Sequence, residues 1–185
     1  MRVIQVLGPD QFITTPWKNG GGITHEITRQ RSDNGFAWRL SIAEVDQDGP
    51  FSIFKGMSRI LTVIEGAGLH LISDTETLYA TCCKPCAFSG ETVINSRLID
   101  GPIRDFNVIY DPTLIRANVQ VITASTDLPN PANRHAQQAL YAISGSVSIG
   151  EVTIPQGHVA LFATTAPAQI VLHTAAKALL VSLQD

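Results

Sequence analysis

The sequence predicts an all-β fold with few short helices, and two observations support this. Short runs of β-branched and aromatic residues are interrupted about every eight to twelve residues by Gly, Pro, Asn or Asp. No stretch sustains the i, i+3, i+4 spacing of apolar residues that marks an amphipathic helix. Many short strands joined by regular turns are typical of a β-sandwich or a β-barrel.

Alternating polarity and turn residues locate the individual strands. One clear example is the stretch FAWRLSIA, in which Trp38, Leu40 and Ile42 share one face while Arg39 and Ser41 share the other. The predicted strands cover residues 2–7, 23–29, 37–44, 59–65, 68–73, 76–80, 92–98, 105–110, 117–123, 138–144, 146–149, 159–163, 168–172 and 178–182.

A weak internal repeat refines the architecture. Residues 60–66 and residues 139–145 each form a predicted strand that ends in glycine, and each is followed by a short strand and a Pro-marked turn into another strand. This order is typical of a cupin hairpin. The sequence therefore predicts a bicupin, one compact unit of two cupin-like barrels. The first barrel comprises mainly residues 15–110, and the second mainly residues 111–185 with the N-terminal strand.

The composition excludes several classes of partner. Hydrophobic residues make up 44% of the chain and charged residues 16%, and the net charge is −3 with no block of like charges. Nucleic-acid and membrane-surface proteins normally carry a basic face, so neither partner is expected. The first residues lack the apolar stretch of a signal peptide, and no run approaches the ~18 apolar residues of a membrane span. We expect a cytoplasmic protein.

Neither histidine nor cysteine forms a metal-binding pattern, so no metal and no cofactor are expected. The histidines, at positions 25, 70, 135, 158 and 173, never occur as a close pair. Cys83 and Cys86 match the CxxC redox pattern, but no helix is predicted to follow them and no second cysteine pair exists. With Cys82 they form an odd, clustered set, which suits a reducing compartment and a structural role.

The most unusual segment is WKNGGGITHE at residues 17–26. Consecutive glycines permit positive φ and close approach of the backbone, and successive N–H groups in such a turn can form an anion-binding nest. No GxxxxGK[ST] order is present, so a phosphate loop is excluded. The alternatives are a ligand site and a plain Gly-rich turn between two edge strands. The flanking Trp17, Lys18, Asn19, Thr24 and Glu26 favour the ligand site.

Two further groups of polar residues follow. Arg39 and Arg59 would suit an acidic ligand if both faced one barrel interior, because arginine binds carboxylates bidentately; alternatively both are solvated on edge strands. Asp105 and Asn107 share a strand face, which points either into the barrel as binding groups or outward to solvent. Phe51 and Phe54 are expected to anchor a loop in the core.

Four motifs carry a resemblance to a known family. WKNGGGITHEI, WRLSIAEV, DGPFSIFKGMSR and LIDGPIRDFNVI follow one another over about the first 110 residues, and together they resemble the HutD/Ves family of bacterial proteins. The remaining residues match only in outline. One departure is Lys55, where the family motif usually has Pro.

The resemblance implies a two-barrel cupin fold with no established enzymatic reaction. One branch of the family is linked to histidine utilisation, where binding of a small acidic intermediate such as formylglutamate or urocanate has been suggested, and the other to environmental stress. Matched by position, the ligand-binding residues it implies are Trp17, Lys18, Asn19, Thr24, Glu26, Arg39, Ser41, Arg59, Asp105 and Asn107.

Three hypotheses follow. The first is a metal-independent protein that binds a small acidic or polar metabolite, with a regulatory role in histidine utilisation or the stress response. The second is a metal-free cupin enzyme, an isomerase or lyase in which Glu26 or His25 is the general base. The third is an oligomerisation module, such as a homodimer, in which apolar edge strands pair between subunits.

Overall fold

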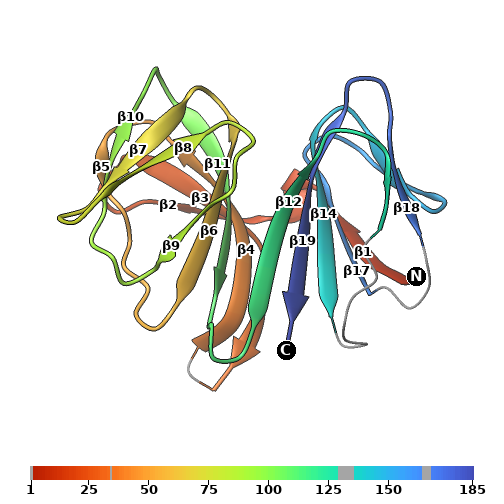
Figure 1. Ribbon diagram of the computed structural model, residues 1–185, viewed down its shortest axis with the longest axis horizontal. Helices are drawn as coiled ribbons and strands as arrows, with labels where there is room; N and C mark the ends of the chain where they lie inside the picture. Colours follow the sequence, from red (N-terminus) through yellow and green to blue (C-terminus); the bar gives the residue numbers. More distant parts are fainter. Residues whose placement is uncertain (1, 34, 129–135, 164–167) are drawn as a thin grey trace. The chain divides into compact units, whose positions relative to one another are not determined.

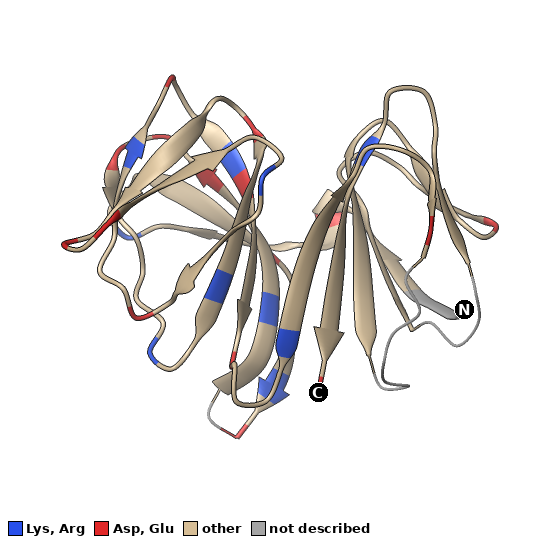
Figure 2. Cartoon of the chain, in the orientation of Figure 1, with Lys and Arg blue, Asp and Glu red and all other residues tan. Residues whose placement is uncertain are grey.

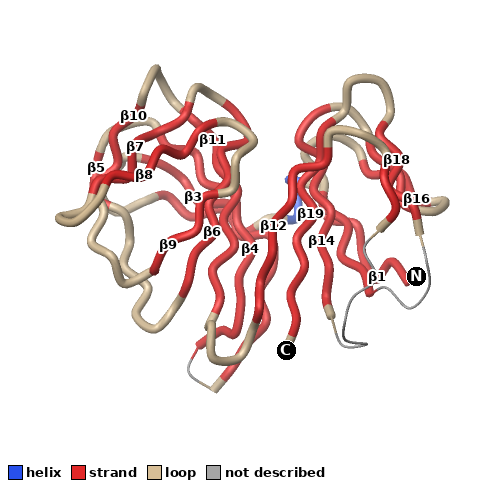
Figure 3. The backbone as a smooth tube through the Cα atoms, in the orientation of Figure 1, coloured by secondary structure: helices blue, strands red, loops and turns tan. Residues whose placement is uncertain are grey.

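The computed structural model describes residues 2–33, 35–128, 136–163 and 168–185 (Figure 1). These residues form two compact units, a central unit of residues 12–114 and a terminal unit of residues 1–11 and 115–185. The prediction of an all-β fold is confirmed, because the one helical element in the described part of the chain is the 3-10 turn η1 (Pro9–Gln11) (Figure 3). No helix in these ranges has the length and apolarity that crossing a membrane requires. His135 lies outside the described residues.

The central unit contains ten strands in two sheets. One sheet has the order β2-β3-β4-β11-β6-β9, and the other has the order β5-β10-β7-β8. The strands are β2 (Ile13–Pro16), β3 (Gly22–Ser32), β4 (Gly35–Val45), β5 (Gly49–Pro50), β6 (Ser58–Glu65), β7 (Gly68–Ile72), β8 (Thr77–Thr81), β9 (Cys86–Ser89), β10 (Asn95–Leu98) and β11 (Ile103–Tyr110).

The terminal unit is also built from two sheets, with the orders β1-β17-β14-β19-β12 and β13-β18-β15-β16. Its strands are β1 (Arg2–Leu7), β12 (Arg116–Ile122), β13 (Thr126–Asp127), β14 (Gln137–Ser144), β15 (Val147–Ile149), β16 (Val152–Ile154), β17 (Val159–Ala163), β18 (Gln169–Leu172) and β19 (Lys177–Gln184). In both units the described strands pair as two separate sheets rather than as one continuous barrel.

The two units repeat one pattern of strand pairing. In the central unit β6 pairs with β9 and β11, while β7 pairs with β8 and β10. In the terminal unit β14 pairs with β17 and β19, while β15 pairs with β16 and β18. The internal repeat seen in the sequence corresponds to β6 and β14. Each of these strands is followed by a hairpin glycine with positive φ, Gly66 at 91° and Gly145 at 63°.

Every predicted strand overlaps an observed strand, and the largest differences in length are at β3, β4 and β19, which are longer than predicted, and at β10, which is shorter. The run at residues 92–98 was expected to be a full strand, but only Asn95–Leu98 pairs, because Thr92 N–H instead donates to Ser89 O in a turn. The structure adds β2, β5, β9, β13 and β16 to the predicted ranges, and of these β9 was expected only as the strand that follows the Pro-marked turn of the repeat. Each has only two to four residues, too few to show alternation, and β2 is exposed throughout.

The alternation on β4 is confirmed, and it positions the site. Trp38, Leu40 and Ile42 are buried on one face of the strand. The opposite face presents Arg39, Ser41 and Ala43 toward a cavity inside the central unit. A hydrophobic cluster that includes Leu61, Val63 and Leu69 adjoins this cavity, because Ala43 belongs both to the cluster and to the cavity lining.

Candidate functional site

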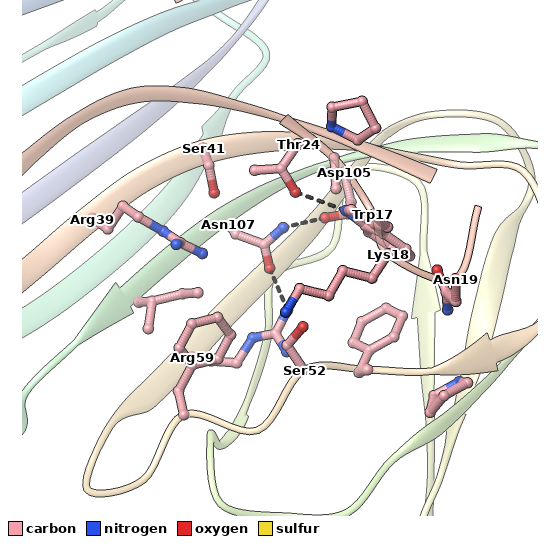
Figure 4. Close-up of a pocket in the computed structure, with 16 residues that line it drawn as sticks. Trp17, Lys18, Asn19, Thr24, Arg39, Ser41, Ser52, Arg59, Asp105 and Asn107 are labelled. Carbon is pink, nitrogen blue, oxygen red and sulfur yellow. Dashed lines mark hydrogen bonds between the residues drawn. The ribbon is translucent and has the colours of Figure 1, made fainter. Parts of the chain in front are cut away.

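A cavity of about 560 Å³ lies within the central unit (Figure 4). Its walls come from the β2–β3 turn, from β3, β4, β6 and β11, and from the segment between β5 and β6. Nine of the ten site residues that the sequence predicted line this cavity: Trp17, Lys18, Asn19, Thr24, Arg39, Ser41, Arg59, Asp105 and Asn107. Residues from opposite ends of a 90-residue stretch are therefore brought together.

Strand pairing explains why these side chains converge. On adjacent strands, residues in register share a face. Asn107 on β11 lies opposite Ser41 on β4, and Asp105 lies opposite Ala43. Thr24 on β3 lies opposite Ala43 from the other side. The period of two places Arg39, Ser41 and Ala43 on one face of β4, and Asp105, Asn107 and Ile109 on one face of β11. The pairing of the strands turns these faces toward the cavity.

The floor of the cavity holds a chain of hydrogen bonds among three buried residues. Arg59 Nη2 donates to Asn107 Oδ1 over 2.9 Å, and Asn107 Nδ2 donates to Asp105 Oδ1 (Figure 4). Arg59, Asn107 and Asp105 are only 7%, 4% and 1% exposed. The alternative interpretations of Arg59 as a solvated edge residue, and of Asp105 and Asn107 as an outward face, are wrong.

Burial has the largest effect on the pKa values of Asp105 and Arg59 in this group of hydrogen-bonded residues. It raises the pKa of the Asp105 carboxyl to about 7, although the Arg59 cation and the hydrogen bond from Asn107 oppose the rise. It lowers the pKa of the Arg59 guanidinium to about 10, opposed by Asp105 and assisted by the positive charge of Arg39. Arg59 therefore stays cationic at neutral pH, while Asp105 titrates close to neutrality.

Aromatic rings hold both arginines in place. The guanidinium carbon of Arg59 lies 5.1 Å from the ring centroids of Phe51 and Phe88. Phe54 contacts both cations, at 5.0 Å from Arg39 and 5.5 Å from Arg59. Cation–π attraction gives these guanidinium groups a fixed orientation without neutralising their charge. The loop phenylalanines were expected to anchor a loop in the core, and the half-buried Phe51 and Phe54 line the cavity.

Several polar atoms of the cavity residues lack a partner. Among the described residues, Arg39 Nε, Arg59 Nε and Asp105 Oδ2 are buried and accept or donate no hydrogen bond. Buried polar groups are normally hydrogen-bonded, so three unpartnered atoms around one cavity mark it as a candidate ligand site. The lining carries three cationic side chains, Lys18, Arg39 and Arg59, and one carboxyl group, that of Asp105.

The Gly-rich turn shapes the cavity edge, and two of its glycine amides bond within the turn. Gly20 N–H donates to Trp17 O, and Gly21 N–H donates to Asn19 Oδ1, so these two amides are not offered to an anion. Gly22 is required because a Cβ there would lie 2.3 Å from Glu44 O and 3.1 Å from the Trp17 ring. Trp17 in turn donates from Nε1 to Thr24 Oγ1 over 2.8 Å. The glycines thus allow Trp17 to pack at the cavity wall.

The two residues suggested as general bases lie outside the cavity lining. Glu26 shares the strand face of Thr24, but its carboxylate pairs with Arg29 Nε at 3.3 Å. His25 is on the opposite face of β3, where Nδ1 contacts Thr14 Oγ1 at 2.9 Å and Nε2 contacts Glu44 at 3.3 Å. Of the ten predicted site residues, Glu26 is the one that the cavity does not include.

The other residue clusters form no competing site in the described ranges. No group of three or more His, Cys, Asp or Glu side chains there is arranged to hold a metal ion. The Sγ atoms of Cys82 and Cys83 lie 3.6 Å apart, and burial raises the pKa of the Cys86 thiol. His70 packs edge-on against Tyr79, with ring centroids 4.9 Å apart.

Sequence reasoning missed Ser52, which lines the cavity, and Phe88, which stacks on Arg59. Phe88 lies directly opposite Arg59 in the β6–β9 register. Its role depends on which strand pairs with β6, and a single sequence does not reveal that. Ser52 lies in a segment between two strands, where alternation gives no direction to the side chain.

The fold is that of a cupin-like β protein. The chain is similar to a cupin 2 conserved barrel domain protein from Leptotrichia buccalis, with a TM-score of 0.61 and 9% sequence identity over 100% of this chain and 98% of that one. The HutD family model matches residues 10–180, and the chain belongs to the HutD family.

Relatives and solved structures support this membership. An uncharacterized 21.2 kDa protein in the hutC 3' region of Pseudomonas putida is 40% identical over 152 residues, which is 80% of this chain and 78% of the relative. Protein Ves from Escherichia fergusonii is 37% identical over 109 residues, 57% of this chain and 56% of Ves. The resemblance to the HutD/Ves family is therefore confirmed.

Two solved structures match almost the whole chain. A conserved protein of unknown function from Pseudomonas aeruginosa PAO1 is 34% identical, with a TM-score of 0.85 over 98% of both chains. HutD from Pseudomonas fluorescens SBW25, solved in a formate condition, is 29% identical, with a TM-score of 0.83 over 98% of this chain and 99% of that one.

Proposed function

We propose that this chain binds a small carboxylate-bearing metabolite in the cavity of the central unit and needs no metal to do so. The observation that carries this proposal is the pair of arginines, Arg39 and Arg59, that line one cavity with their Nε atoms unpartnered among the described residues. A guanidinium group matches a carboxylate in shape and charge, and such charge-assisted hydrogen bonds are roughly twice as strong as neutral ones.

The arrangement of the arginines favours binding of an anion over a purely structural role. Asp105 reaches Arg59 only through Asn107, so no carboxylate in the described residues forms a direct ion pair with Arg59. Phe54 lies against both guanidinium groups, and the positive charge of Arg39 is one of the causes that lower the pKa of Arg59. Two like charges held together in a buried site repel, and an anionic ligand would relieve that repulsion.

The rest of the cavity suits the remainder of such a ligand. Its volume of about 560 Å³ lies within the range of small-molecule sites, ~300–1,000 Å³. The rings of Trp17 and Phe51, packed edge to face at 6.3 Å, offer apolar surface for a short carbon skeleton. Lys18, Asn19 and Ser52 are exposed and offer further polar contacts.

A thermal-shift titration with matched acids and amides tests the proposal. Acetate, succinate and glutamate should each raise the melting temperature with a concentration dependence that follows mass action, whereas acetamide and succinamide should not. Arg39→Gln should abolish the shift, because it removes one cation while keeping a side chain of similar length. Arg104→Gln is the matched control, since Arg104 pairs with Glu44 and Glu65 away from the cavity. If no acid stabilises the wild-type protein, the proposal is wrong.

The role that we propose is regulatory, in histidine utilisation, and the stress response is the alternative role. Membership of the HutD family and the relative in the hutC 3' region of Pseudomonas putida support the first, and similarity to Ves supports the second. We further propose a cytoplasmic protein in which each unit is a cupin-type barrel, a bicupin, as the repeated strand pairing suggests. A homodimer remains a proposal that a sizing column tests.

The enzyme hypothesis receives no support from its suggested bases. A general base must come within hydrogen-bond distance of the substrate proton, and neither His25 nor Glu26 lines the cavity. Both side chains are engaged elsewhere, by Glu44 and Arg29 respectively.

A further inference from the structure

Asp105 is the acidic residue in an otherwise cationic cavity, and its surroundings do little to stabilise its charge. It is 1% exposed, and its Oδ2 atom has no hydrogen-bond partner among the described residues. The residues in register on either side of it are Ala43 on β4 and Val63 on β6, neither of which can donate a hydrogen bond from its side chain. A buried carboxylate normally requires a direct cation or several donors.

The hydrogen bonds around Asp105 have a defined direction. Arg59 can only donate, so the Asn107 atom that it contacts must be the amide oxygen. The Asn107 amide nitrogen is therefore the atom that donates to Asp105 Oδ1. This single donor occupies one oxygen of Asp105, and Oδ2 is left as the atom that can carry a proton.

Charged groups face Asp105 from several elements. Arg59 approaches from β6, Arg39 lines the cavity from β4, and Lys18 lines it from the β2–β3 turn. Glu26 on β3 shares the cavity-facing side of its strand but pairs with Arg29. No charged residue of the segment between β5 and β6 lines the cavity, which receives Phe51, Ser52 and Phe54 from that segment.

We propose that binding of an anion in this cavity is accompanied by the uptake of one proton at Asp105. The inference rests on the proposed function, because it concerns the same cavity. A ligand carboxylate near Arg39 and Arg59 brings a second negative charge close to a carboxylate that is already poorly stabilised. Two carboxylates in one buried site do not both remain ionised, and protonation of Asp105 removes the conflict.

This coupling makes anion binding depend on pH around neutrality. Burial raises the pKa of free Asp105 to about 7, so the unliganded protein begins to lose this proton near neutral pH. Above that pH the proton must be taken from solvent for the anion to bind, and the apparent affinity falls with a slope that approaches about tenfold for each pH unit. A simple carboxylic acid is already fully ionised in this range, so the ligand itself contributes no such dependence.

Isothermal titration calorimetry with acetate tests the inference. Titrations at pH 8 in imidazole and in Tris, which differ in their enthalpy of protonation, should show that about one proton is taken up for each acetate bound. Because about half of unliganded Asp105 is still protonated at pH 7, the affinity should fall by about fivefold between pH 7 and pH 8. In Asp105→Asn, whose amide imitates the protonated acid, the affinity should be independent of pH and no proton should be taken up. Asp46→Asn, an exposed position outside the cavity lining, should behave as the wild type.

The outcomes separate this inference from the proposed function. Acetate binding to the wild type without proton uptake overturns the inference and leaves the proposed function intact. Proton uptake that persists in Asp105→Asn places the proton on another group and also overturns it. If neither acetate, succinate nor glutamate binds, the proposed function fails and the inference with it. If Asp105→Asn does not fold, the number of protons that the wild type takes up for each acetate bound tests the inference by itself.

Discussion

The central and terminal units share one pattern of strand pairing, yet one encloses a polar cavity and the other an apolar core. The registers allow a position-by-position comparison. Val63 and Ala142 each precede the hairpin glycine by three residues, and they lie opposite Asp105 and Ala178 respectively. By the same registers, Asn107 corresponds to Leu180, and Arg59 corresponds to Gln138.

The described residues of the terminal unit fill the corresponding interior mostly with apolar side chains. Ala178 and Leu180 belong to a continuous apolar cluster with Leu140 and Phe162. Figure 2 shows no charged residue on β14, whereas β4 and β6 of the central unit carry basic residues. Since the terminal unit completes this pattern of strand pairing with Ala178, Leu180 and the uncharged Gln138 at the corresponding positions, the buried charges of Arg59 and Asp105 are not required by the fold. Their presence therefore supports the proposed function.

The largest effect is expected from Ala178→Asp, which places the acid of the central unit into the terminal core. The carboxylate would have no donor comparable to Asn107 and no cation comparable to Arg59. The free energy of unfolding should fall by about 3 kcal/mol or more, as measured by urea denaturation. Ala175→Asp, at an exposed turn position, should change it by only about 0.5 kcal/mol. Equal losses at both positions would contradict the comparison.

The second prediction concerns the pH dependence of stability that Asp105 causes. Its pKa is about 7 in the folded protein and 3.8 in the reference state, so the folded state holds the proton more tightly. Asp105 thus costs no stability at low pH, and its contribution falls by about 1.4 kcal/mol per pH unit between those two values. Above about pH 7 the loss levels off.

Asp105→Asn should remove this slope, so that the variant gains on the wild type as the pH rises from 5 to 7. Urea denaturation at pH 5, 6 and 7 measures the difference. Parallel curves for the two proteins would show that Asp105 is ionised throughout the range.

The third prediction converts a residue of the cavity into its counterpart in the terminal unit. Arg59→Gln reproduces Gln138 and removes a buried cation from the proposed anion site. A hydrogen bond to a charged group contributes about 1.5–3 kcal/mol, so carboxylate affinity should fall by a factor of roughly 10 to 150. Calorimetry with acetate measures it, and Arg97→Gln, exposed on β10, serves as the control. Unchanged affinity in Arg59→Gln would place the anion elsewhere.

The smallest effect is expected at the two hairpin glycines. In Gly66→Ala the new Cβ would lie 2.7 Å from Pro102 O at a φ of 91°, so the backbone must shift. In Gly145→Ala the nearest atom is Ala176 Cβ at 3.0 Å, and the φ of 63° is the ordinary left-handed value. We expect a loss of about 1 kcal/mol for Gly145→Ala and about 2 kcal/mol for Gly66→Ala. Thermal denaturation that ranks them in the opposite order would count against this account.

The alternation of β4 and β11 made much of the site predictable. Period-two spacing placed Arg39 with Ser41, and Asp105 with Asn107, before any pairing was known. Glu26 shows the limit of the same rule, because it shares a face with Thr24 and yet pairs with Arg29 rather than lining the cavity. The Gly-rich turn shows a second limit, since two of its glycine amides bond within the turn.

The sequence by itself determined the all-β class, the internal repeat and the faces on which the polar residues lie, because these follow from local periodicity and turn chemistry. Only the tertiary structure decided that Arg59 and Asp105 are buried, that Phe88 stacks on Arg59, and that the pKa of Asp105 rises to about 7. These properties depend on which strands pair and on how far water is excluded. Both are set by contacts between residues distant in the chain, which no local pattern records.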